Sequence, residues 1–403
     1  MVKRLAVLSL HTSPLAQAGV GDGGGMNVYV RELATALAQT GVHCRVYVRA
    51  WDNDLPRFVE VEPGFEIVHV NAGPYDAPKD QLARYVDEFA HGVAQDFETF
   101  KPEAIHANYW LSGVAGNALK CQFNLPLIAT FHTLARVKAD SGDYEPESRA
   151  RAETDVIGCS DIVMSNCDAE SKQLVDFYDT DPDRIEVIPP GVDHAFFSPG
   201  PKSGARWALK SDERPLLLFV GRIQPLKGVD VAVKALAASS HSDARLWIVG
   251  GASGTQGASE LANIRRLITD LDVEDRVEFY PPQPHHLLST FYRAADVVLV
   301  PSKSESFGLV ALEAAACGTP CVASAVGGLL TLVEEGRTGY LIDDRNPQKF
   351  ADAVDRILSD PDLAAKMSSD AANHALNYTW CESARKLAAV VSALADRELS
   401  PCE

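Results

Sequence analysis

Glycines gather between Gly19 and Gly25, directly before a helical pattern that begins at Asn27. Glycine lets the backbone approach an anion closely, and a helix N-terminus supplies unpaired N–H groups and partial positive charge. The segment therefore predicts an anion-binding loop, with a plain surface loop as the alternative. Gly19, Gly21 and Gly24 also fit G-x-G-x-x-G, but a dinucleotide site is disfavoured. The residues from His11 to Ala18 separate the glycines from the first strand, and Arg49 rather than an acid ends the second.

Two cations flank one turn after a later strand pattern, in the segment Gly221-Arg222 to Lys227-Gly228. Arg222 follows the strand and Lys227 stands at the start of the next helix. Two such cations can hold a diphosphate through charge-assisted hydrogen bonds. The alternative is a solvated surface pair.

Two glutamates, Glu305 and Glu313, follow the apolar strand pattern at residues 297–300. Glu313 falls about two turns into an otherwise apolar helix, where a carboxylate costs free energy unless it has a partner. A ribose diol is one such partner, and a structural ion pair is the alternative. Glu305 could hold sugar hydroxyls, while the backbone amides from Phe307 to Leu309 face a phosphate. Otherwise Glu305 only complements the helix dipole.

Short β-branched runs alternate with helical patterns along the chain, which predicts parallel sheets joined by right-handed crossovers. A Pro/Gly-rich stretch between residues 189 and 201 interrupts the alternation and predicts a linker. We therefore expect an α/β fold with two doubly wound domains, 1–195 and 196–380. Ligands in this architecture bind at the carboxyl ends of the strands, so a cleft between the domains is the expected site. The predicted strands are 5–10, 45–48, 66–70, 104–106, 127–131, 162–165 and 185–188 in the first domain, and 216–220, 245–249, 277–280, 297–300 and 320–323 in the second.

Composition excludes several classes of function. The 403 residues include 37 Lys and Arg against 55 Asp and Glu, a net charge of −18, which disfavours nucleic acid and anionic lipid as partners. No apolar run approaches the roughly 18 residues of a membrane span. The eight cysteines contain no C-x-x-C pair and are expected to be unpaired, as in a reduced cytoplasmic protein.

The motifs G-R-x-x-x-x-K-G and E-S-F-G-L-x-x-x-E, together with the glycine-rich first loop, resemble the retaining GT-B glycosyltransferases of family four. The resemblance covers nearly the whole chain. It implies two Rossmann-like domains that face a central cleft, and a last helix, 381–403, that follows the Tyr378-Thr-Trp380 stretch and returns to the first domain.

The same resemblance implies roles for individual residues. His132, Arg222, Lys227 and Glu305 would be the catalytic residues. The UDP-sugar donor would be bound by Gly25, Arg222, Lys227, Glu305, Phe307, Gly308, Leu309 and Glu313. The acceptor would be bound by Asn27, Lys79, Tyr109, Thr133 and Arg149. Two cations and two hydroxyls in the acceptor set are suited to a phosphomonoester.

The segments 11–29, 71–75, 109–113 and 132–138 are similar to the branch of the family that transfers N-acetylglucosamine from its UDP conjugate onto 1D-myo-inositol 3-phosphate in mycothiol biosynthesis. The resemblance implies a cytoplasmic enzyme, possibly homodimeric, that needs no cofactor beyond the UDP-sugar co-substrate and no metal. The pairs Asp52-x-Asp54 and Asp179-x-Asp181 are expected by chance in so acidic a chain.

The chain departs from that branch on the acceptor side, at His106-Ala-Asn108 and at Lys138-Ala139. Sucrose-phosphate-synthase-like transfer of glucose to fructose 6-phosphate is therefore an alternative. A sugar-nucleotide epimerase would need no acceptor set. An NAD(P)-dependent oxidoreductase is disfavoured by the late glycines. A sugar-nucleotide sensor would bind the donor without releasing UDP.

Overall fold

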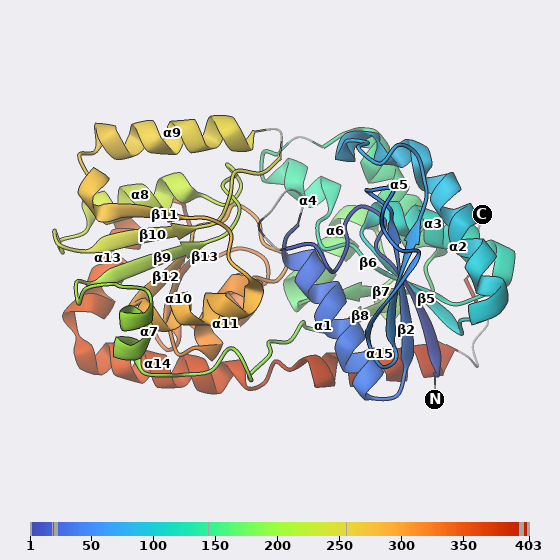
Figure 1. Ribbon diagram of the computed structural model, residues 1–403. Helices are drawn as coiled ribbons and strands as arrows, with labels where there is room; N and C mark the ends of the chain where they lie inside the picture. Colours follow the sequence, from blue (N-terminus) through green and yellow to red (C-terminus); the bar gives the residue numbers. More distant parts are fainter. Residues whose placement is uncertain are drawn as a thin grey trace. The chain divides into compact units, whose positions relative to one another are not determined.

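The computed structural model of the chain describes residues 2–17, 19, 23–143, 145–254, 256–394 and 399–400. Close contacts divide the chain into two compact units. The first unit comprises Met1–Ala16, Met26–Gly191 and Trp380–Glu403, and the second comprises Gln17–Gly25 and Val192–Thr379. In each unit, helices cover a mainly parallel sheet (Figure 1).

The first unit is built on an eight-stranded sheet in which only the edge strand β3 is antiparallel to its neighbour. Strands β1 and β2 are parallel and are joined through a helix, as a parallel pair requires, whereas β3 and β4 are joined by a short turn. In spatial order the strands are β3 (Phe58–Glu62), β4 (Phe65–Val70), β2 (His43–Arg49), β1 (Arg4–Leu8), β5 (Ala104–Asn108), β6 (Leu127–Thr130), β7 (Ile162–Ser165) and β8 (Ile185–Val187).

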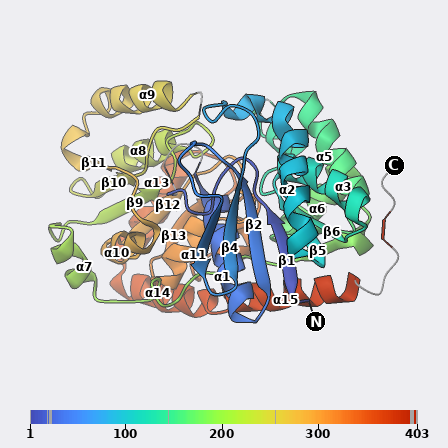
Figure 2. The ribbon, with the colours of Figure 1, turned by 45° about the vertical axis from the view of Figure 1, so that its right-hand side comes forward.

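Helices of the first unit bury apolar faces spaced at helical periodicity. In α2, Phe89, Val93 and Phe97 recur every four residues and pack into one core cluster. Helix α15 lies beside the N-terminal strand (Figure 2), where the Val2 amide donates to Ser392 Oγ at 3.3 Å. The helices are α1 (Gly25–Gln39), α2 (Val86–Phe100), α3 (Trp110–Phe123), α4 (Ala135–Asp140), α5 (Glu147–Cys159), α6 (Asp168–Tyr178) and α15 (Trp380–Leu394), with short 3-10 helices η1 (Lys79–Tyr85) and η2 (Pro182–Arg184).

The second unit contains a six-stranded sheet in which every pair is parallel. Its four inner strands are buried along nearly their whole length, as expected where helices cover both faces, whereas the two edge strands keep partial exposure. In spatial order they are β11 (Val277–Tyr280), β10 (Arg245–Val249), β9 (Leu216–Val220), β12 (Val297–Val300), β13 (Cys321–Ser324) and β14 (Gly339–Ile342).

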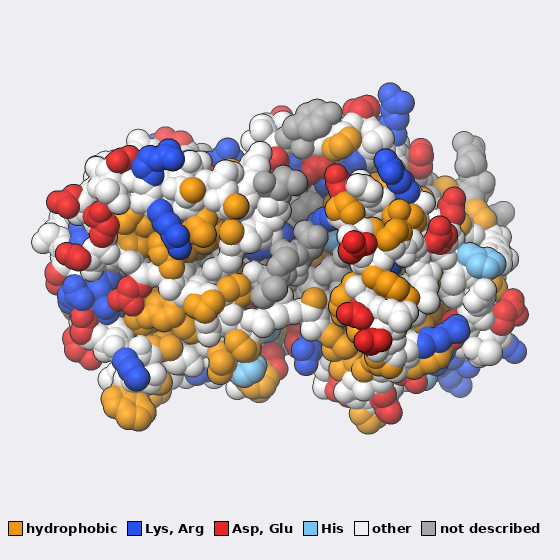
Figure 3. Space-filling model, turned by 45° about the horizontal axis from the view of Figure 1, so that its top comes forward, with side chains coloured by type: hydrophobic (Ala, Val, Ile, Leu, Met, Phe, Trp, Pro, Cys, Tyr) orange, Lys and Arg blue, Asp and Glu red, His pale blue; other side chains and the backbone are white. Residues whose placement is uncertain are grey.

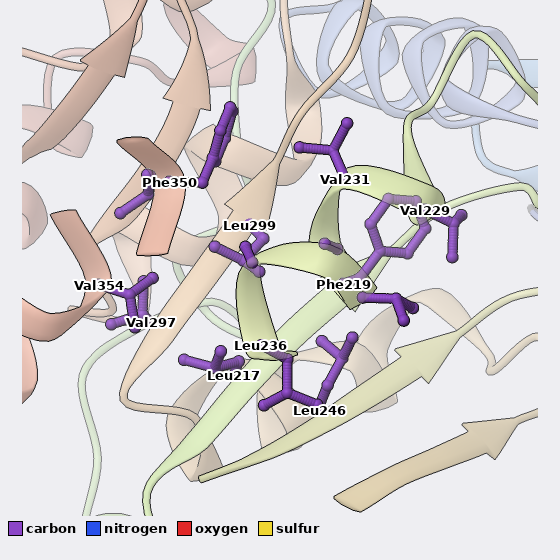
Figure 4. Close-up of a cluster of buried hydrophobic side chains, with 14 of the residues drawn as sticks. Leu217, Phe219, Val229, Val231, Leu236, Leu246, Val297, Leu299, Phe350 and Val354 are labelled. Atoms are coloured by element: carbon purple, nitrogen blue, oxygen red, sulfur yellow. The ribbon is translucent and has the colours of Figure 1, made fainter. Parts of the chain in front are cut away.

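Figure 4 shows the core of this unit, where Leu217, Phe219 and Leu246 of the sheet meet Val229, Leu236 and Phe350 of the helices. Helices α8 and α13 pack together there. The helices of this unit are α7 (Lys202–Ala208), α8 (Val229–Ala238), α9 (Gly257–Asp270), α10 (Leu288–Ala294), α11 (Leu309–Ala316), α12 (Leu329–Leu332), α13 (Pro347–Ser359) and α14 (Pro361–Ala375), with the 3-10 helices η3 (Glu274–Arg276) and η4 (His285–Leu287).

The expected α/β class with two doubly wound sheets is confirmed. The sequence reasoning missed the edge strands β3 and β14. Strand β3 alternates apolar and acidic residues, and β14 is only four residues long and starts at a glycine, so neither resembles the β-branched runs of the inner strands. Arg49 is buried and donates to the carbonyl oxygens of Ala72, Pro74 and Tyr75, so it has a structural role at the end of β2.

Six of the cysteines carry free thiols, at positions 44, 159, 167, 317, 321 and 381. Cys121 is disulfide-bonded, so the expectation of unpaired cysteines is wrong at that position, and Cys402 lies outside the described residues. Among the residues that the structure describes, no helix is both long enough and apolar enough to cross a membrane. Acidic and basic side chains are interspersed over the face drawn in Figure 3.

A buried ion pair ties three elements of the first unit together. Lys120 of α3 donates to Asp161 at 2.8 Å and to the Cys159 carbonyl at the end of α5, while the Leu127 amide at the start of β6 donates to the same carboxylate. Both side chains are 3% exposed. Removing one charge of such a pair leaves the other desolvated and uncompensated.

We therefore expect Lys120→Met to lower the free energy of unfolding by about 3–5 kcal/mol, because Asp161 would stay buried without its counter-charge. Urea denaturation measures the change. The control is Lys386→Met on α15, where the Lys386 ammonium lies 3.9 Å from Glu382 at the surface and is expected to contribute at most about 0.5 kcal/mol. Equal stability of the two variants would contradict the prediction.

Candidate functional site

Two loops at the carboxyl ends of neighbouring strands β9 and β12 carry most of the expected donor-binding residues. The loop after β9 holds Arg222 and Lys227, and the loop after β12 holds Glu305. The amide of Lys303 donates to the carbonyl of Leu226 at 2.8 Å, which joins the loops. Parallel strands end at one edge of the sheet, so the fold brings these residues together as the sequence predicted.

Lys227 and Glu305 form an ion pair, with Nζ 2.6 Å from Oε2. The Ser302 hydroxyl donates to the same oxygen at 3.1 Å. Both side chains of the pair are about one-fifth exposed, so the charges remain accessible to a ligand. An ammonium has three donors, so Lys227 can bind a phosphate oxygen without leaving the carboxylate.

The Glu305 loop is shaped by close backbone packing, which the sequence analysis did not predict. The Gly328 amide donates to the Glu305 carbonyl at 3.1 Å. A Cβ at Gly327 would lie 1.7 Å from that carbonyl oxygen, and one at Gly328 would lie 2.3 Å from Phe307. Only glycine fits this approach. The Gly-Gly pair in the sequence was the available signal.

The helix after this loop, α11, begins beyond Gly308, whose φ of +103° lies in the region that favours glycine. A helix start leaves its first amides without partners inside the helix. These amides, from Leu309 onward, present partial positive charge. Phe307 itself is buried and its ring meets that of Tyr378 edge-on at 5.9 Å.

Glu313 has buried protein partners that the sequence did not reveal. Its Oε1 lies 2.7 Å from His285 Nε2, and Tyr292 donates to Oε2 at 2.8 Å. Burial, followed by the Glu313 charge, raises the pKa of Tyr292 well above its usual value, which keeps the phenol protonated as a donor. Glu313 therefore has structural partners, and its role in binding a ribose stays a prediction. Each carboxylate oxygen still has lone-pair capacity for a diol.

Part of the glycine-rich segment clusters with the second unit. A Cβ at Gly24 would lie 3.7 Å from the Arg222 guanidinium carbon, and one at Gly25 would lie 3.4 Å from Leu309. Gly25 therefore stands near the start of α11, as the donor-binding prediction requires. Gly21 lies outside the described residues, so the G-x-G-x-x-G pattern is not tested.

In the first unit, Tyr109 is the centre of the expected acceptor set. Its ring lies 5.4 Å from Lys79 Nζ, 5.0 Å from the Arg149 guanidinium carbon and 4.3 Å from the His11 ring. Its φ of 75° and ψ of 154° are conformations that residues other than glycine rarely adopt, at a cost of about 1–3 kcal/mol. Such strain persists only where the surroundings enforce it and is enriched at functional sites.

Arg149 and Thr133 complete this cluster. Arg149 Nη2 donates to the carbonyl and hydroxyl oxygens of Thr133 at 2.9 and 3.0 Å. The same guanidinium donates to Glu153 at 2.8 Å and pairs with Glu145 at 2.9 Å. The structure thus brings together Lys79, Tyr109, Thr133 and Arg149, and it adds two glutamates that the sequence reasoning did not single out.

His132 stands beside this cluster with a φ of +61°. Its Nε2 lies 2.9 Å from Asn108 Oδ1 at the end of β5. Because an amide oxygen only accepts hydrogen bonds, the imidazole must carry its proton on Nε2 to donate this bond. Burial, and secondarily His106, lower the pKa of His132 to about 3, so the imidazole is neutral at physiological pH. In this neutral tautomer Nδ1 carries no proton, so it can only accept a hydrogen bond.

Asn27 is buried and donates to Thr12 Oγ1 at 2.6 Å and to the Ser13 carbonyl at 2.5 Å. These bonds hold the segment after β1, and a role for Asn27 in acceptor binding stays a prediction. The Asp-x-Asp pairs lie in turns, where Asp52 accepts from the Asp54 amide and Asp181 from the Asp183 amide. No group of three or more potential metal ligands occurs among the described residues.

Two family models match the chain. The model described as "Glycosyltransferase Family 4" matches residues 23–196, and the model described as "Glycosyl transferases group 1" matches residues 204–374. Together they cover both units.

Curated relatives match over nearly the full length. The chain is 44% identical over 411 residues to a "D-inositol 3-phosphate glycosyltransferase" of Acidothermus cellulolyticus, with 98% of this chain and 91% of the relative covered. It is 43% identical to the protein of the same name in Actinosynnema mirum, with 98% of each covered.

Solved structures agree with the fold. A sucrose-phosphate synthase of Thermosynechococcus elongatus superposes with a TM-score of 0.91 at 32% identity, covering 97% of this chain and 99% of the other. The Anabaena protein HepE, crystallised with UDP-glucose, superposes with a TM-score of 0.78 at 20% identity, covering 97% of this chain and 100% of the other. With the two family models and the full-length curated relatives, these likenesses show that the chain belongs to the GT-B glycosyltransferases of family four.

Proposed function

We propose that this enzyme transfers N-acetylglucosamine from UDP-N-acetylglucosamine to 1D-myo-inositol 3-phosphate with retention of configuration at the transferred carbon. The observation that carries the proposal is the cluster of Lys79 and Arg149 around the strained Tyr109, with Thr133 beside it. Two cations and two hydroxyls match a phosphomonoester. Relatives named for D-inositol 3-phosphate, matched over nearly the full length, support this acceptor.

On the donor side, negative charge grows on the diphosphate as the bond to the sugar stretches. Arg222, Lys227 and the amides at the start of α11 are cationic or partially positive groups at one edge of the second sheet. Groups fixed in advance stabilise such charge more than water does. Glu305 would hold sugar hydroxyls and Glu313 the ribose diol, with His285 and Tyr292 orienting its carboxylate.

In this mechanism no side chain acts as a nucleophile. The acceptor hydroxyl attacks on the face that UDP leaves, and a diphosphate oxygen takes its proton. Holding two anionic substrates in line then supplies most of the rate enhancement. Neutral His132, oriented by Asn108, would accept a hydrogen bond at Nδ1 from a substrate hydroxyl near the reacting carbon rather than transfer a proton, since its lowered pKa makes it a weak base.

A second candidate is transfer of glucose to fructose 6-phosphate. It is favoured by the likeness to a sucrose-phosphate synthase structure at a TM-score of 0.91 and 32% identity. Both candidates use the same residues for the UDP part of the donor, and they differ in the transferred sugar and in the acceptor. A panel of UDP-N-acetylglucosamine or UDP-glucose with inositol phosphate or fructose 6-phosphate, read by UDP release, distinguishes them.

Arg222→Ala and Lys227→Ala are each expected to lower the rate of UDP release about 10²–10³-fold with every acceptor, because each removes charge that stabilises the leaving diphosphate. Steady-state kinetics measure the loss. Lys234→Ala is the matched control, since its ammonium pairs with Asp230 at 3.1 Å on α8. Unchanged turnover in either site variant would rule out this assignment of the donor site.

Lys79→Ala is expected to raise the acceptor KM about 10-fold or more while kcat stays within about 3-fold, because the lost contact is a charge-assisted bond to the acceptor phosphate. Arg84→Ala, on the same 3-10 helix and exposed, serves as control. If the chain were an epimerase, the Lys79→Ala variant would be as active as the unaltered chain. That result would refute the acceptor assignment.

Turnover is expected to continue undiminished in excess chelator, because Arg222, Lys227 and the α11 amides supply the positive charge that a metal would otherwise provide. UDP release with and without chelator is the measurement, and loss of activity that Mg²⁺ or Mn²⁺ restores would contradict it. A homodimer and a cytoplasmic location, both implied by the family resemblance, stay predictions.

A further inference from the structure

Glu145 occupies the space between two cations of the acceptor cluster. Its Oε1 accepts from Lys138 Nζ and lies 2.9 Å from Arg149 Nη1. Lys138 belongs to α4 and Arg149 to α5, while Glu145 lies in the segment that connects these helices. One oxygen that bridges two cations is the arrangement that a bound phosphate would make.

The two glutamates that contact Arg149 differ in what else holds them. Glu153 is fully buried, and it also accepts from the Ala135 amide at 2.8 Å and from the Tyr178 hydroxyl. Glu145 is partly exposed, at 12%, and its described bonds go to the two cations. Glu153 is therefore built into the helix packing, whereas Glu145 can leave without breaking that packing.

The surroundings of Glu145 are those of the proposed phosphate site. The Tyr109 ring lies 5.0 Å from the Arg149 guanidinium carbon. Burial raises the pKa of the Tyr109 phenol, and the charges of Arg149, Glu145 and Lys138 act on the same pKa. Arg149 donates Nε–H to Glu153 and the N–H groups of Nη2 to Thr133. Because Nε and Nη2 are engaged, a phosphate would contact Arg149 through Nη1, where it competes with Glu145.

We propose that Glu145 is an internal competitor for the acceptor phosphate, and that Lys138 is a further phosphate-binding residue exposed when Glu145 is displaced. The proposal deepens the proposed function and rests on it for the identity of the acceptor. A carboxylate brings one negative charge to the two cations, whereas a phosphomonoester brings close to two at neutral pH. Displacement therefore favours a phosphorylated acceptor over one that carries a single charge or none.

Glu145 also contributes to the charge balance of the empty site. Buried or half-buried cations without counter-charges raise the free energy of the folded state. Arg149 also pairs with Glu153, and Lys138 also pairs with Asp143 at 3.0 Å, so Glu145 is one of three carboxylates among the described residues that compensate the two cations before the acceptor arrives. Its negative charge weakens acceptor binding. Removing its charge should therefore tighten the binding of phosphate.

The test is binding of inorganic phosphate to the whole protein at pH 8 without nucleotide, measured by calorimetry. Glu145→Gln is expected to bind phosphate at least 10-fold more tightly than the unaltered chain. Lys138→Met is expected to bind it at least 10-fold more weakly than the unaltered chain. Arg149 keeps its bonds to Glu153 and Thr133 in both variants, and thermal unfolding checks that each is folded.

Glu147→Gln is the matched control. It removes the same charge two residues away, in the first turn of α5, where Glu147 is 68% exposed and lies 3.8 Å from the equally exposed Arg151. Its phosphate affinity is expected to stay within about twofold of the unaltered chain. If Glu145→Gln does not fold, Glu145→Asp replaces it, because the shorter carboxylate cannot reach both cations and should also bind phosphate more tightly.

Phosphate affinity in Glu145→Gln that is equal to or below that of the unaltered chain would overturn the proposal, as would an equal gain in Glu147→Gln. Turnover is measured separately with inositol phosphate and fructose 6-phosphate. Tighter phosphate binding by Glu145→Gln would support displacement of Glu145 by phosphate. If the chain nevertheless transferred sugar to neither acceptor, the proposed function would be refuted and the displacement of Glu145 would not.

Discussion

Neutralisation of cations by nearby carboxylates is the interaction on which both candidate sites depend. In the second unit Glu305 holds Lys227, and in the first Glu145 and Glu153 hold Arg149. A chain with a net charge of −18 repels anionic substrates over long range. Local positive charge must therefore be concentrated, and the fold must compensate it while the site is empty.

Two residues of the first unit have strained backbone conformations in or next to the expected acceptor set. Tyr109 and His132 both have positive φ values, of 75° and 61°, and they follow the ends of the adjacent strands β5 and β6. The Tyr109 amide donates to the Thr130 carbonyl at 2.8 Å, which ties the two loops together. The sheet therefore holds both strained residues in place, Tyr109 within the expected acceptor set and His132 next to Thr133 in the sequence.

The regular part of the fold could be predicted from the sequence because buried parallel strands are continuous apolar runs, as in 216–220 and 245–249. Strands β3 and β14 could not, since β3 alternates apolar and acidic residues and β14 is only four residues long and starts at a glycine. Motif spacing placed Lys227 and Glu305 at one sheet edge. It could not reveal His285 and Tyr292 beside Glu313, or Glu145 beside Arg149, because those contacts depend on tertiary packing of unremarkable residues.

The proposed function requires that fixed cations in the first unit recognise the phosphate of the acceptor. The most direct measurement is the ratio of kcat/KM for inositol phosphate to that for unphosphorylated myo-inositol, with UDP-N-acetylglucosamine saturating. Two or more charge-assisted bonds predict a ratio of about 10³ or greater. Equal kcat/KM values for the two acceptors would contradict the account.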